Sequence, residues 1–246
     1  MDSVLKKTLL EVAAGRGRIT VMTGAGISAE SGIPTFRGPE GYWTVGSREY
    51  HPQKMATYAM FRQHPEAVWA WYLYRLGVCR RAFPNDGHRA LVKLEALFAD
   101  RFTLITQNVD GLHLRAGNSP ERTFQIHGNV FFMRCAENCR PDLVPMPETL
   151  HGKEKGEPLT ESERGALRCP ACSGWSRPHV LWFDETYNEE HFRFVSSLKI
   201  ASETELLLIV GTSGATNLPN QVARQVAEKG GVIVDVNIEP NPFSRL

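Results

Sequence analysis

Four of the five cysteines lie in two close pairs whose spacing suits metal binding. The first pair is Cys135 and Cys139 and the second is Cys169 and Cys172, with 29 residues between the pairs. A C-x3-C turn and a C-x2-C turn can each present two thiolates, and two such turns complete a tetrahedral site for Zn²⁺. Because four protein ligands leave no open position on the metal, the pattern predicts a structural zinc. The remaining Cys79 is predicted to be a small buried residue at the end of an apolar helix.

A glycine-rich turn follows a short apolar run near the start of the chain. Residues Gly24 to Ala29 read Gly-Ala-Gly-Ile-Ser-Ala, the G-x-G-x-x-A form whose glycines let the backbone approach a pyrophosphate. Dehydrogenases that bind a dinucleotide also place an acidic ribose ligand about 20 residues further on. Here the chain runs instead through Pro34-Thr-Phe-Arg37. Hydride transfer is therefore disfavoured, and a purely structural turn is the alternative that this motif alone leaves open.

Polar side chains follow two further apolar runs. Gln107, Asn108 and Asp110 come after one run, and His127 comes after the next. Ligands of open parallel sheets bind at the carboxyl ends of the strands, where amides and a carboxylate suit a carboxamide and ribose hydroxyls. Histidine is the side chain best matched to proton transfer near neutral pH. The alternatives are that the first three residues cap a turn and that His127, one of eight histidines, is a surface or core residue.

These groups need a framework of alternating strands and helices. Short, mostly β-branched runs predict five strands buried on both faces, over Arg18–Thr23, Phe102–Thr106, Thr123–Ile126, Glu205–Val210 and Val232–Asn237. Helices are predicted over Asp86–Ala99, with Asp86 as the N-cap, Glu189–Lys199 and Leu218–Glu228. This order predicts an α/β fold built on a doubly wound, Rossmann-like parallel sheet.

Two stretches interrupt the alternation and predict a second, smaller domain. We expect residues 1–37, 84–129 and 181–246 to form the nucleotide-binding domain. Residues 38–83 are expected to form a helical module and residues 130–180 a zinc-ribbon module, and the two should pack together.

Composition limits the classes of protein to which the chain can belong. Its 246 residues are 42% apolar and 22% charged, which is typical of a soluble enzyme with one large core or a large core and a small one. A formal net charge of +1 gives no global attraction to nucleic acid or to an anionic membrane. The first twelve residues read as one amphipathic helix face and not as a secretory signal. We therefore expect a cytoplasmic protein with reduced thiols that binds neither membranes nor nucleic acid directly.

Together with the glycine turn and the cysteines, three further motifs and a late one give the chain a recognisable family pattern. They are Thr106-Gln-Asn-Val-Asp-Gly-Leu-His113, Ile126-His-Gly-Asn129, Gly211-Thr-Ser213 and Asn237-Ile-Glu239. From about Ile19 to Glu239 the sequence strongly resembles the sirtuins, the NAD-dependent protein deacylases. The resemblance implies NAD as co-substrate, one structural zinc and acyl-lysine proteins or peptides as substrates.

The resemblance also assigns roles to individual residues. Asn108 and Asp110 would hold the nicotinamide amide, Gln107 would touch the nicotinamide ribose, and Phe36 and Arg37 would belong to a lid over the cofactor. His127 would act as the general base on that ribose, giving free lysine, nicotinamide and O-acyl-ADP-ribose as products. The full set that would contact NAD is Gly24, Ala25, Gly26, Ser28, Ala29, Phe36, Arg37, Gln107, Asn108, Asp110, His127, Gly211, Thr212, Ser213, Asn237 and Glu239.

The acyl group is indicated by two residues on a predicted helix that starts near Pro65. Tyr72 and Arg75 stand at i and i+3 on one face, and they resemble the Tyr-x-x-Arg motif with which class III sirtuins bind succinyl, malonyl or glutaryl lysine. Without that context, an arginine among aromatics is more often a surface residue stacked on a ring. The other predicted substrate contacts are Leu181, Phe183 and Glu185.

Two segments depart from the family pattern. Leu181 and Asp184 stand where the family commonly has valine and glycine, and Asp184 would oppose an anionic acyl group if it pointed inward. The segment Thr212–Pro219 has one or two residues more than usual. Two other functions stay open. A protein ADP-ribosyltransferase would use the same NAD site, and a zinc-ribbon module for nucleic acid or protein would need a basic face that the net charge disfavours.

Overall fold

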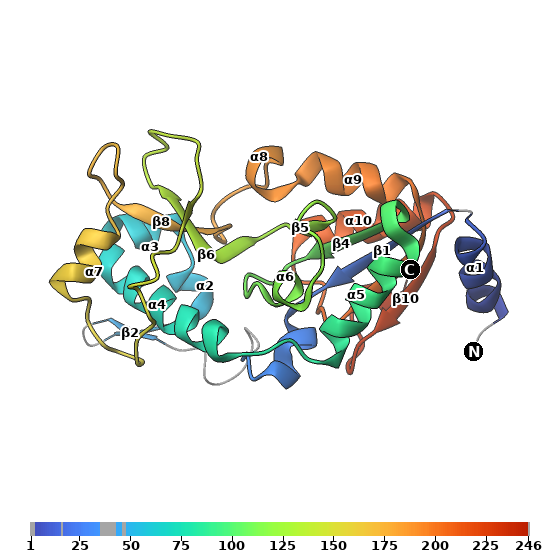
Figure 1. The fold of residues 1–246 in the computed structure, drawn as a ribbon, viewed down its shortest axis with the longest axis horizontal. Coiled ribbons are helices and arrows are strands. Elements are labelled where there is room, and N and C mark those ends of the chain that lie inside the picture. The colour runs from blue at the N-terminus through green and yellow to red at the C-terminus, as the bar shows by residue number, and fades with distance from the viewer. Residues whose placement is uncertain (1–2, 16, 35–42, 46–47, 246) are drawn as a thin grey trace.

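The computed structural model describes residues 3–15, 17–34, 43–45 and 48–245. Its centre is one parallel sheet of five strands in the order β10-β9-β1-β4-β5 (Figure 1). The strands are β1 (Arg18–Thr23), β4 (Phe102–Thr106), β5 (Thr123–Gln125), β9 (Thr204–Val210) and β10 (Val232–Val236). This confirms the predicted doubly wound sheet, and the ends of β1 and β4 are those predicted.

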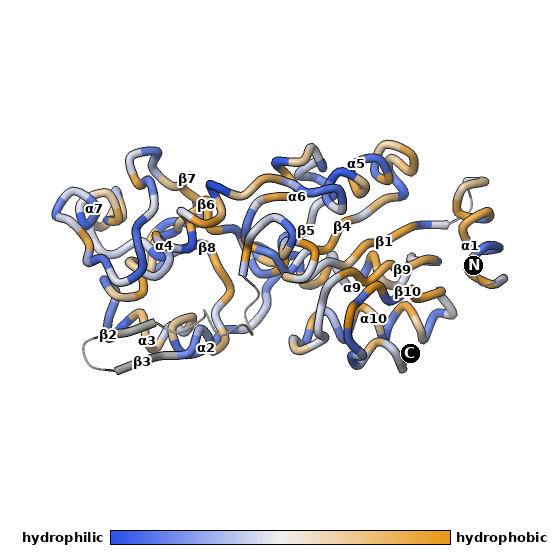
Figure 2. Tube along the Cα trace, turned by 90° about the horizontal axis from the view of Figure 1, so that it is seen from below, coloured by the Kyte–Doolittle hydropathy of each residue, from blue (hydrophilic) through white to orange (hydrophobic). Residues whose placement is uncertain are grey.

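Strand β1 lies at the middle of the sheet because nearly all of its side chains are apolar or β-branched. Met22 pairs with Ile105 of β4 on one side and with Ile209 of β9 on the other. All three side chains are fully buried. A strand covered on both faces selects a continuous apolar run, and the strong orange colour of the central strands shows this run (Figure 2).

Helices cover both faces of the sheet (Figures 1 and 2). Helices α9 (Phe194–Ser202) and α10 (Asn217–Glu228) pack on one face, in a core that contains Ile105, Leu207 and Val222. Helices α1 (Ser3–Ala13) and α5 (Asp86–Phe98) pack on the other face, where the core contains Val12 and Leu91. Shorter elements complete this half of the molecule, namely the 3-10 helices η1 (Ala25–Ser31), η3 (Ala99–Arg101) and η4 (Pro242–Arg245) and the helix α6 (Leu112–Ala116).

Two predicted helix boundaries were wrong, each because a side chain caps the backbone in a way that the sequence pattern did not reveal. Asn85, and not Asp86, is the N-cap of α5, since its side chain accepts from the backbone N–H of His88. The helix predicted over Glu189–Lys199 is broken at Arg193, which has a left-handed φ of 53°. Helix α8 (Glu189–Phe192) ends there, and the Glu189 carboxylate accepts from the backbone N–H of Ser196 in α9 at 2.9 Å.

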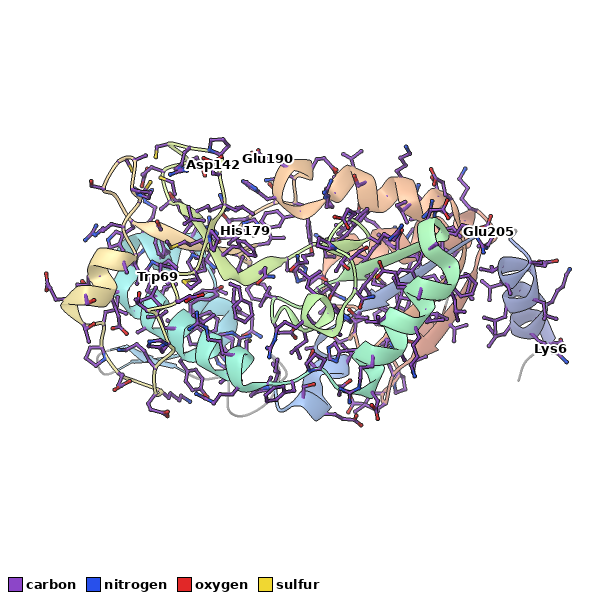
Figure 3. The ribbon with its side chains drawn as sticks, viewed as in Figure 1. Lys6, Trp69, Asp142, His179, Glu190 and Glu205 are labelled. Carbon is purple, nitrogen blue, oxygen red and sulfur yellow. The ribbon has the colours of Figure 1, made fainter. Side chains whose placement is uncertain are left out.

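The two interrupting stretches form a second lobe with its own core. A three-stranded antiparallel sheet, ordered β7-β6-β8, packs against helices from the first stretch (Figure 1). Trp69, placed on the long helix of this lobe in Figure 3, donates from Nε1 to the Ser176 carbonyl at 2.8 Å. The elements are β2 (Trp43–Val45), β3 (Arg48–Tyr50), α2 (Pro52–Met55), α3 (Tyr58–Gln63), α4 (Pro65–Arg81), β6 (Gly128–Cys135), β7 (Val144–Pro145), α7 (Glu161–Ala166) and β8 (Ser176–Val180). The exact domain limits stay a prediction.

No helix in the described part of the chain combines the length and the apolar character that crossing a membrane requires. The cellular compartment stays a prediction.

Candidate active site and metal site

The predicted glycine turn lies at the carboxyl edge of the sheet, pressed against the end of β9. Gly26 donates its backbone N–H to the Gly211 carbonyl at 2.8 Å, and Gly24 donates to the Val210 carbonyl at 3.0 Å. A Cβ on Gly26 would lie 2.7 Å from the Gly211 Cα, a separation that real side chains do not reach. The glycines are therefore needed for the two strand ends to meet, and Gly26 stays exposed at the edge.

Ser28 is the centre of a buried hydrogen-bond network in the same place. Its hydroxyl donates to Asp110 Oδ2 at 2.7 Å and accepts from Asn108 Nδ2 at 3.0 Å. Because the single hydroxyl hydrogen is used on the carboxylate, His88 Nε2, 3.4 Å away, must be a donor as well. The other Asp110 oxygen accepts from the backbone N–H of Leu112 at 2.8 Å. The structure thus brings together three of the residues predicted to contact NAD.

Gln107 has both ends of its side-chain amide engaged by threonines. Its Nε2 donates to Thr212 Oγ1 at 2.8 Å, and its Oε1 accepts from Thr216 Oγ1 at 3.0 Å. Both threonines belong to the segment with extra residues between β9 and α10. This segment therefore fixes the orientation of the amide at the end of β4.

The hydrogen bonds of His127 define which ring nitrogen can accept a proton. Nδ1 lies 3.1 Å from the backbone carbonyl of Gln107, and since a carbonyl only accepts, Nδ1 carries the hydrogen. Burial lowers the pKa of His127 to about 4, although the Gln107 carbonyl acts in the opposite direction. The ring is therefore neutral at pH 7, and Nε2 carries the lone pair that can accept a hydrogen bond or a proton. That nitrogen lies 2.7 Å from the hydroxyl of Tyr187.

The backbone after His127 is held against the neighbouring strand of the small lobe. Gly128 has a φ of +85°, and a Cβ there would lie 2.1 Å from the His179 carbonyl, so only glycine fits. The backbone N–H of Leu181 also donates to the His127 carbonyl at 3.0 Å. The backbone N–H of Phe183 donates to the Ala56 carbonyl at 2.9 Å. The segment predicted to contact the substrate therefore connects the candidate base with the helices of the small lobe.

Glu185 lies in a buried charge cluster that anchors this segment. Its carboxylate forms a bidentate ion pair with Arg177, one oxygen accepts from the backbone N–H of Trp182 at 3.0 Å, and Arg134 lies 3.8 Å away. The guanidinium of Arg177 also stacks 3.6 Å from the centre of the Trp182 ring. Glu185 is therefore engaged within the protein and holds this segment in place. Phe183, by contrast, is 56% exposed.

Tyr72 and Arg75 lie in α4, and Tyr72 meets Trp182. The Tyr72 hydroxyl accepts from Trp182 Nε1 at 2.8 Å, and burial raises the pKa of this phenol to about 12. Arg75 is half-buried, with its guanidinium 5.2 Å from the centre of the Trp71 ring. The nearby positive charge of Arg75 acts on both Tyr72 and Cys79.

Asp184 points away from the interior of this segment. Its two carboxylate oxygens accept from the backbone N–H groups of Tyr58 at 2.7 Å and Ala59 at 3.0 Å, at the start of α3. A carboxylate at a helix N-terminus is stabilised by the unpaired N–H groups there. The departure at position 184 thus caps a helix.

The other predicted NAD contacts are distributed along the same edge. Ala25 and Ala29 lie in η1, Thr212 is buried, and Ser213 is exposed. Asn237 follows β10 and donates from Nδ2 to the Asp235 carboxylate, while Glu239 is exposed. Phe36 and Arg37 lie outside the described residues.

The four paired cysteines form one cluster in the small lobe. All four sulfurs lie within 4.8 Å of one another, with 3.7 Å between those of Cys135 and Cys172 and 3.6 Å between those of Cys139 and Cys169. A tetrahedral zinc with Zn–S bonds of about 2.3 Å requires sulfurs about 3.8 Å apart. The geometry therefore fits one structural Zn²⁺. Cys79 is buried elsewhere, and burial raises its pKa to about 12, so it is a thiol.

Three buried or half-buried side chains near the site were not singled out from the sequence. His88 and His113 lie beside Ser28 and Thr23, with ring centres 4.8 Å apart. Tyr187 meets His127 from the loop after β8. The only sequence signal for Tyr187 is a lone aromatic within the polar run Asp184-Glu-Thr-Tyr-Asn-Glu-Glu190.

The sequence matches a protein-family model and many curated proteins. The model of the Sir2 family matches residues 24–217. An NAD-dependent protein deacylase of Leptospira interrogans is 40% identical over 228 residues, which cover 92% of this chain and 84% of the relative. The mitochondrial NAD-dependent protein deacylase sirtuin-5 of Danio rerio is 37% identical over 239 residues, covering 92% of this chain and 76% of the relative.

Solved structures give the same relationship. A Sir2 homologue in complex with NAD aligns with a TM-score of 0.78 at 32% identity and covers 97% of this chain and 84% of its own. A Sir2 protein with a p53 peptide and NAD⁺ aligns with a TM-score of 0.76 at 27% identity, covering 97% and 89%. These likenesses confirm the predicted fold, and with the family match they show that the chain belongs to the Sir2 family, the sirtuins.

Proposed function

We propose that this chain is an NAD-dependent protein-lysine deacylase that removes succinyl and malonyl groups preferentially and acetyl groups as well. The observation that carries this proposal is the meeting of Asn108, Asp110 and His127 at the carboxyl edge of the sheet, beside the glycine turn. Relatives named NAD-dependent protein deacylases support it. So do structural neighbours with bound NAD or 2′-O-acetyl ADP-ribose.

NAD fits the donor set at this edge. The turn from Gly24 to Gly26 and the backbone after Gly211 suit the pyrophosphate and adjoining ribose, because glycine leaves the backbone open to a ligand. Asn108 and Asp110 would hold the nicotinamide amide. The amide has an NH₂ donor and a C=O acceptor, which match the side-chain amide of Asn108 and the carboxylate of Asp110. Gln107, already oriented by its threonines, would contact the nicotinamide ribose. Asn237 and Glu239 would lie at the adenosine end, and Phe36 and Arg37 would close over the cofactor.

His127 would act as the general base. The acyl amide oxygen of the substrate attacks the anomeric carbon and expels nicotinamide. A ribose hydroxyl then loses its proton, and Nε2 of His127 gains one. A neutral ring with Nδ1–H donated to Gln107 is the form that can accept a proton there. One water is consumed as the lysine amine leaves, and the products are free lysine, nicotinamide and O-acyl-ADP-ribose.

The preference for acidic acyl groups rests on Tyr72 and Arg75. The Tyr72 oxygen accepts from Trp182, which leaves its own O–H to donate to a carboxylate. Arg75 supplies a positive charge one turn further along α4. Asp184, the residue that would repel an anionic acyl group, is engaged with the start of α3. Helix α4 thus offers a cation and a hydroxyl donor, without an opposing carboxylate from position 184.

Incubation with NAD and matched acetyl-, succinyl- and malonyl-lysine peptides, read by mass spectrometry, tests the proposal. We expect loss of the acyl mass from the peptide, faster for succinyl and malonyl than for acetyl. A gain of one ADP-ribose on the protein or peptide, without loss of the acyl group, would instead establish a protein ADP-ribosyltransferase. Unchanged peptide and NAD would contradict both activities.

A further inference from the structure

Tyr187 lies against the candidate base, although the sequence pattern did not single it out. It is half-buried in the loop between β8 and α8. Its ring centre lies 5.8 Å from that of His127 on one side and 6.3 Å from that of Phe194 on the other, where the rings stack. The ring contacts hold the phenol in place, and the hydroxyl reaches to 2.7 Å from His127 Nε2.

The direction of this hydrogen bond follows from the neighbouring groups. The Gln107 carbonyl fixes the hydrogen of the neutral imidazole on Nδ1, so Nε2 can only accept. Tyr187 must therefore donate its O–H to Nε2. Burial raises the pKa of Tyr187 to about 12, so the phenol keeps its proton at neutral pH. Its oxygen still has lone pairs with which to accept a hydrogen bond from another hydroxyl.

The far side of Tyr187 is supported by the segment that departs from the family spacing. The Tyr187 hydroxyl lies near Thr216, and Thr216 Oγ1 donates its hydrogen to Gln107 Oε1 at 3.0 Å. The backbone carbonyl of the same Gln107 orients His127. Thr216 and Gln107 therefore lie next to the pair of His127 and Tyr187, and Gln107 contacts both the threonine and the base.

We propose that Tyr187 and His127 act as one proton-accepting unit, in which the Tyr187 phenol relays a proton from the substrate hydroxyl to Nε2 of His127. The inference rests on the proposed function, because the hydroxyl is that of the nicotinamide ribose. The O–H bond of the ribose breaks and its proton joins the Tyr187 oxygen, while the Tyr187 O–H bond breaks and its proton joins Nε2. An alkoxide, a neutral phenol and an imidazolium result, so atoms and charge balance.

The variant Tyr187→Phe removes the hydroxyl and keeps the ring that packs on His127 and Phe194. Nicotinamide is expelled before the base acts, so exchange of labelled nicotinamide into NAD with the succinyl peptide should persist in this variant. The single-turnover rate of deacylation should fall about 100-fold, at the low end of what a positioned proton-transfer group contributes. The KM for NAD should stay within about two-fold. Thr216→Val, which keeps the phenol, should lower the rate by a smaller factor.

The number of protons transferred in the rate-limiting step can be measured, and a purely structural role of Tyr187 would not change it. In mixtures of H₂O and D₂O, a plot of the wild-type rate against the deuterium fraction should be curved, because two protons are transferred. The same plot for Tyr187→Phe should be a straight line, because one proton is transferred. A wild-type or raised deacylation rate in Tyr187→Phe, or a straight line for wild type, would overturn the relay while exchange still supports the deacylase. Absence of peptide-dependent exchange in wild type would overturn the proposed function, and the relay with it.

Discussion

The carboxylate of Asp184 accepts a 2.7 Å hydrogen bond from the backbone N–H of Tyr58. This contact ties the substrate segment of the large lobe to the first turn of α3 in the small lobe. It also gives the negative charge at position 184 a partner at the start of α3. The two lobes are thus connected by a helix cap. Mutation of Asp184 can separate the effect of this cap on stability from any effect on substrate recognition.

Asp184→Ala should lower stability without changing acyl preference. The variant leaves two backbone N–H groups at the start of α3 without their acceptor, and loss of an N-terminal cap costs about 1 kcal/mol. Chemical unfolding should show that loss, and the ratio of succinyl to acetyl turnover should stay within about two-fold of wild type. A large rise in desuccinylation would mean that Asp184 repels the acyl carboxylate after all.

Arg75→Met should selectively depress the removal of acidic acyl groups. A charge-assisted hydrogen bond to a carboxylate contributes about 1.5–3 kcal/mol, which corresponds to roughly ten- to hundred-fold in kcat/KM. Methionine keeps most of the apolar stem and loses the guanidinium that lies over Trp71, so activity on acetyl peptides should be unchanged. Arg81→Met, at the exposed end of the same helix, is the matched control. Equal losses on acetyl and succinyl peptides would show that Arg75 has a packing role.

Tyr72→Phe should affect succinyl turnover less than Arg75→Met, but it should also cost stability. The Tyr72 oxygen is the acceptor for the buried Trp182 Nε1, and a buried donor left unpaired costs about 1–3 kcal/mol. Kinetics on both peptides should therefore be compared at a temperature where unfolding measurements show both proteins folded. A fully stable variant would mean that Trp182 finds another acceptor.

The cysteine cluster should hold one zinc per chain. Cys135→Ser removes one of the four sulfurs and should lower both the zinc content and the unfolding temperature, because folding of the small lobe is coupled to metal binding. Elemental analysis checks the metal and calorimetry the stability. Cys79→Ser, a change outside the cluster, should keep its zinc. Active protein without zinc would contradict a structural metal site.

Buried histidines should make the protein sensitive to mild acid. Burial lowers the pKa of His113 to about 3 and that of His179 to about 3, below the ordinary value of 6.5. Below pH 6.5 the unfolded chain binds protons that these folded side chains do not, so stability is full above pH 6.5 and falls as the pH drops towards 3. Each group contributes a slope of up to about 1.4 kcal/mol per pH unit.

Urea unfolding at pH 7, 6 and 5 measures this slope. His113→Gln, which is neutral at every pH, should show a smaller loss of unfolding free energy between pH 7 and pH 5 than wild type, whatever its stability at pH 7. Equal slopes would mean that His113 keeps its ordinary pKa in the folded protein.

Much of the fold could be predicted from the sequence because its strands are buried on both faces. The apolar runs Arg18–Thr23 and Phe102–Thr106 match β1 and β4 at both ends, and the cysteine spacing predicted the cluster. Local capping was harder. Asn85 and Asp86 are both good N-cap residues, and the reciprocal contact of Asn85 with His88 selects the first. The break at Arg193 depends on Glu189 reaching across to Ser196.

Contacts between distant segments could not be derived from the pattern. Whether Asp184 points inward, where it would oppose an anionic acyl group, could not be decided from the sequence, and only the approach of α3 shows its partner. Tyr187 stands in a polar loop without periodicity, so its meeting with His127, 60 residues earlier, follows from the packing of the loop on α9. The site residues themselves stay predictions until variants are measured.

The central claim is tested most directly by the stoichiometry of the products. Wild-type protein with NAD and a succinyl-lysine peptide should yield nicotinamide, free-lysine peptide and O-succinyl-ADP-ribose in equal amounts, quantified together by mass spectrometry. His127→Tyr should remain folded and form no free-lysine peptide, because the general base is lost. Release of nicotinamide with ADP-ribose attached to protein, or deacylation that proceeds without NAD, would contradict the account.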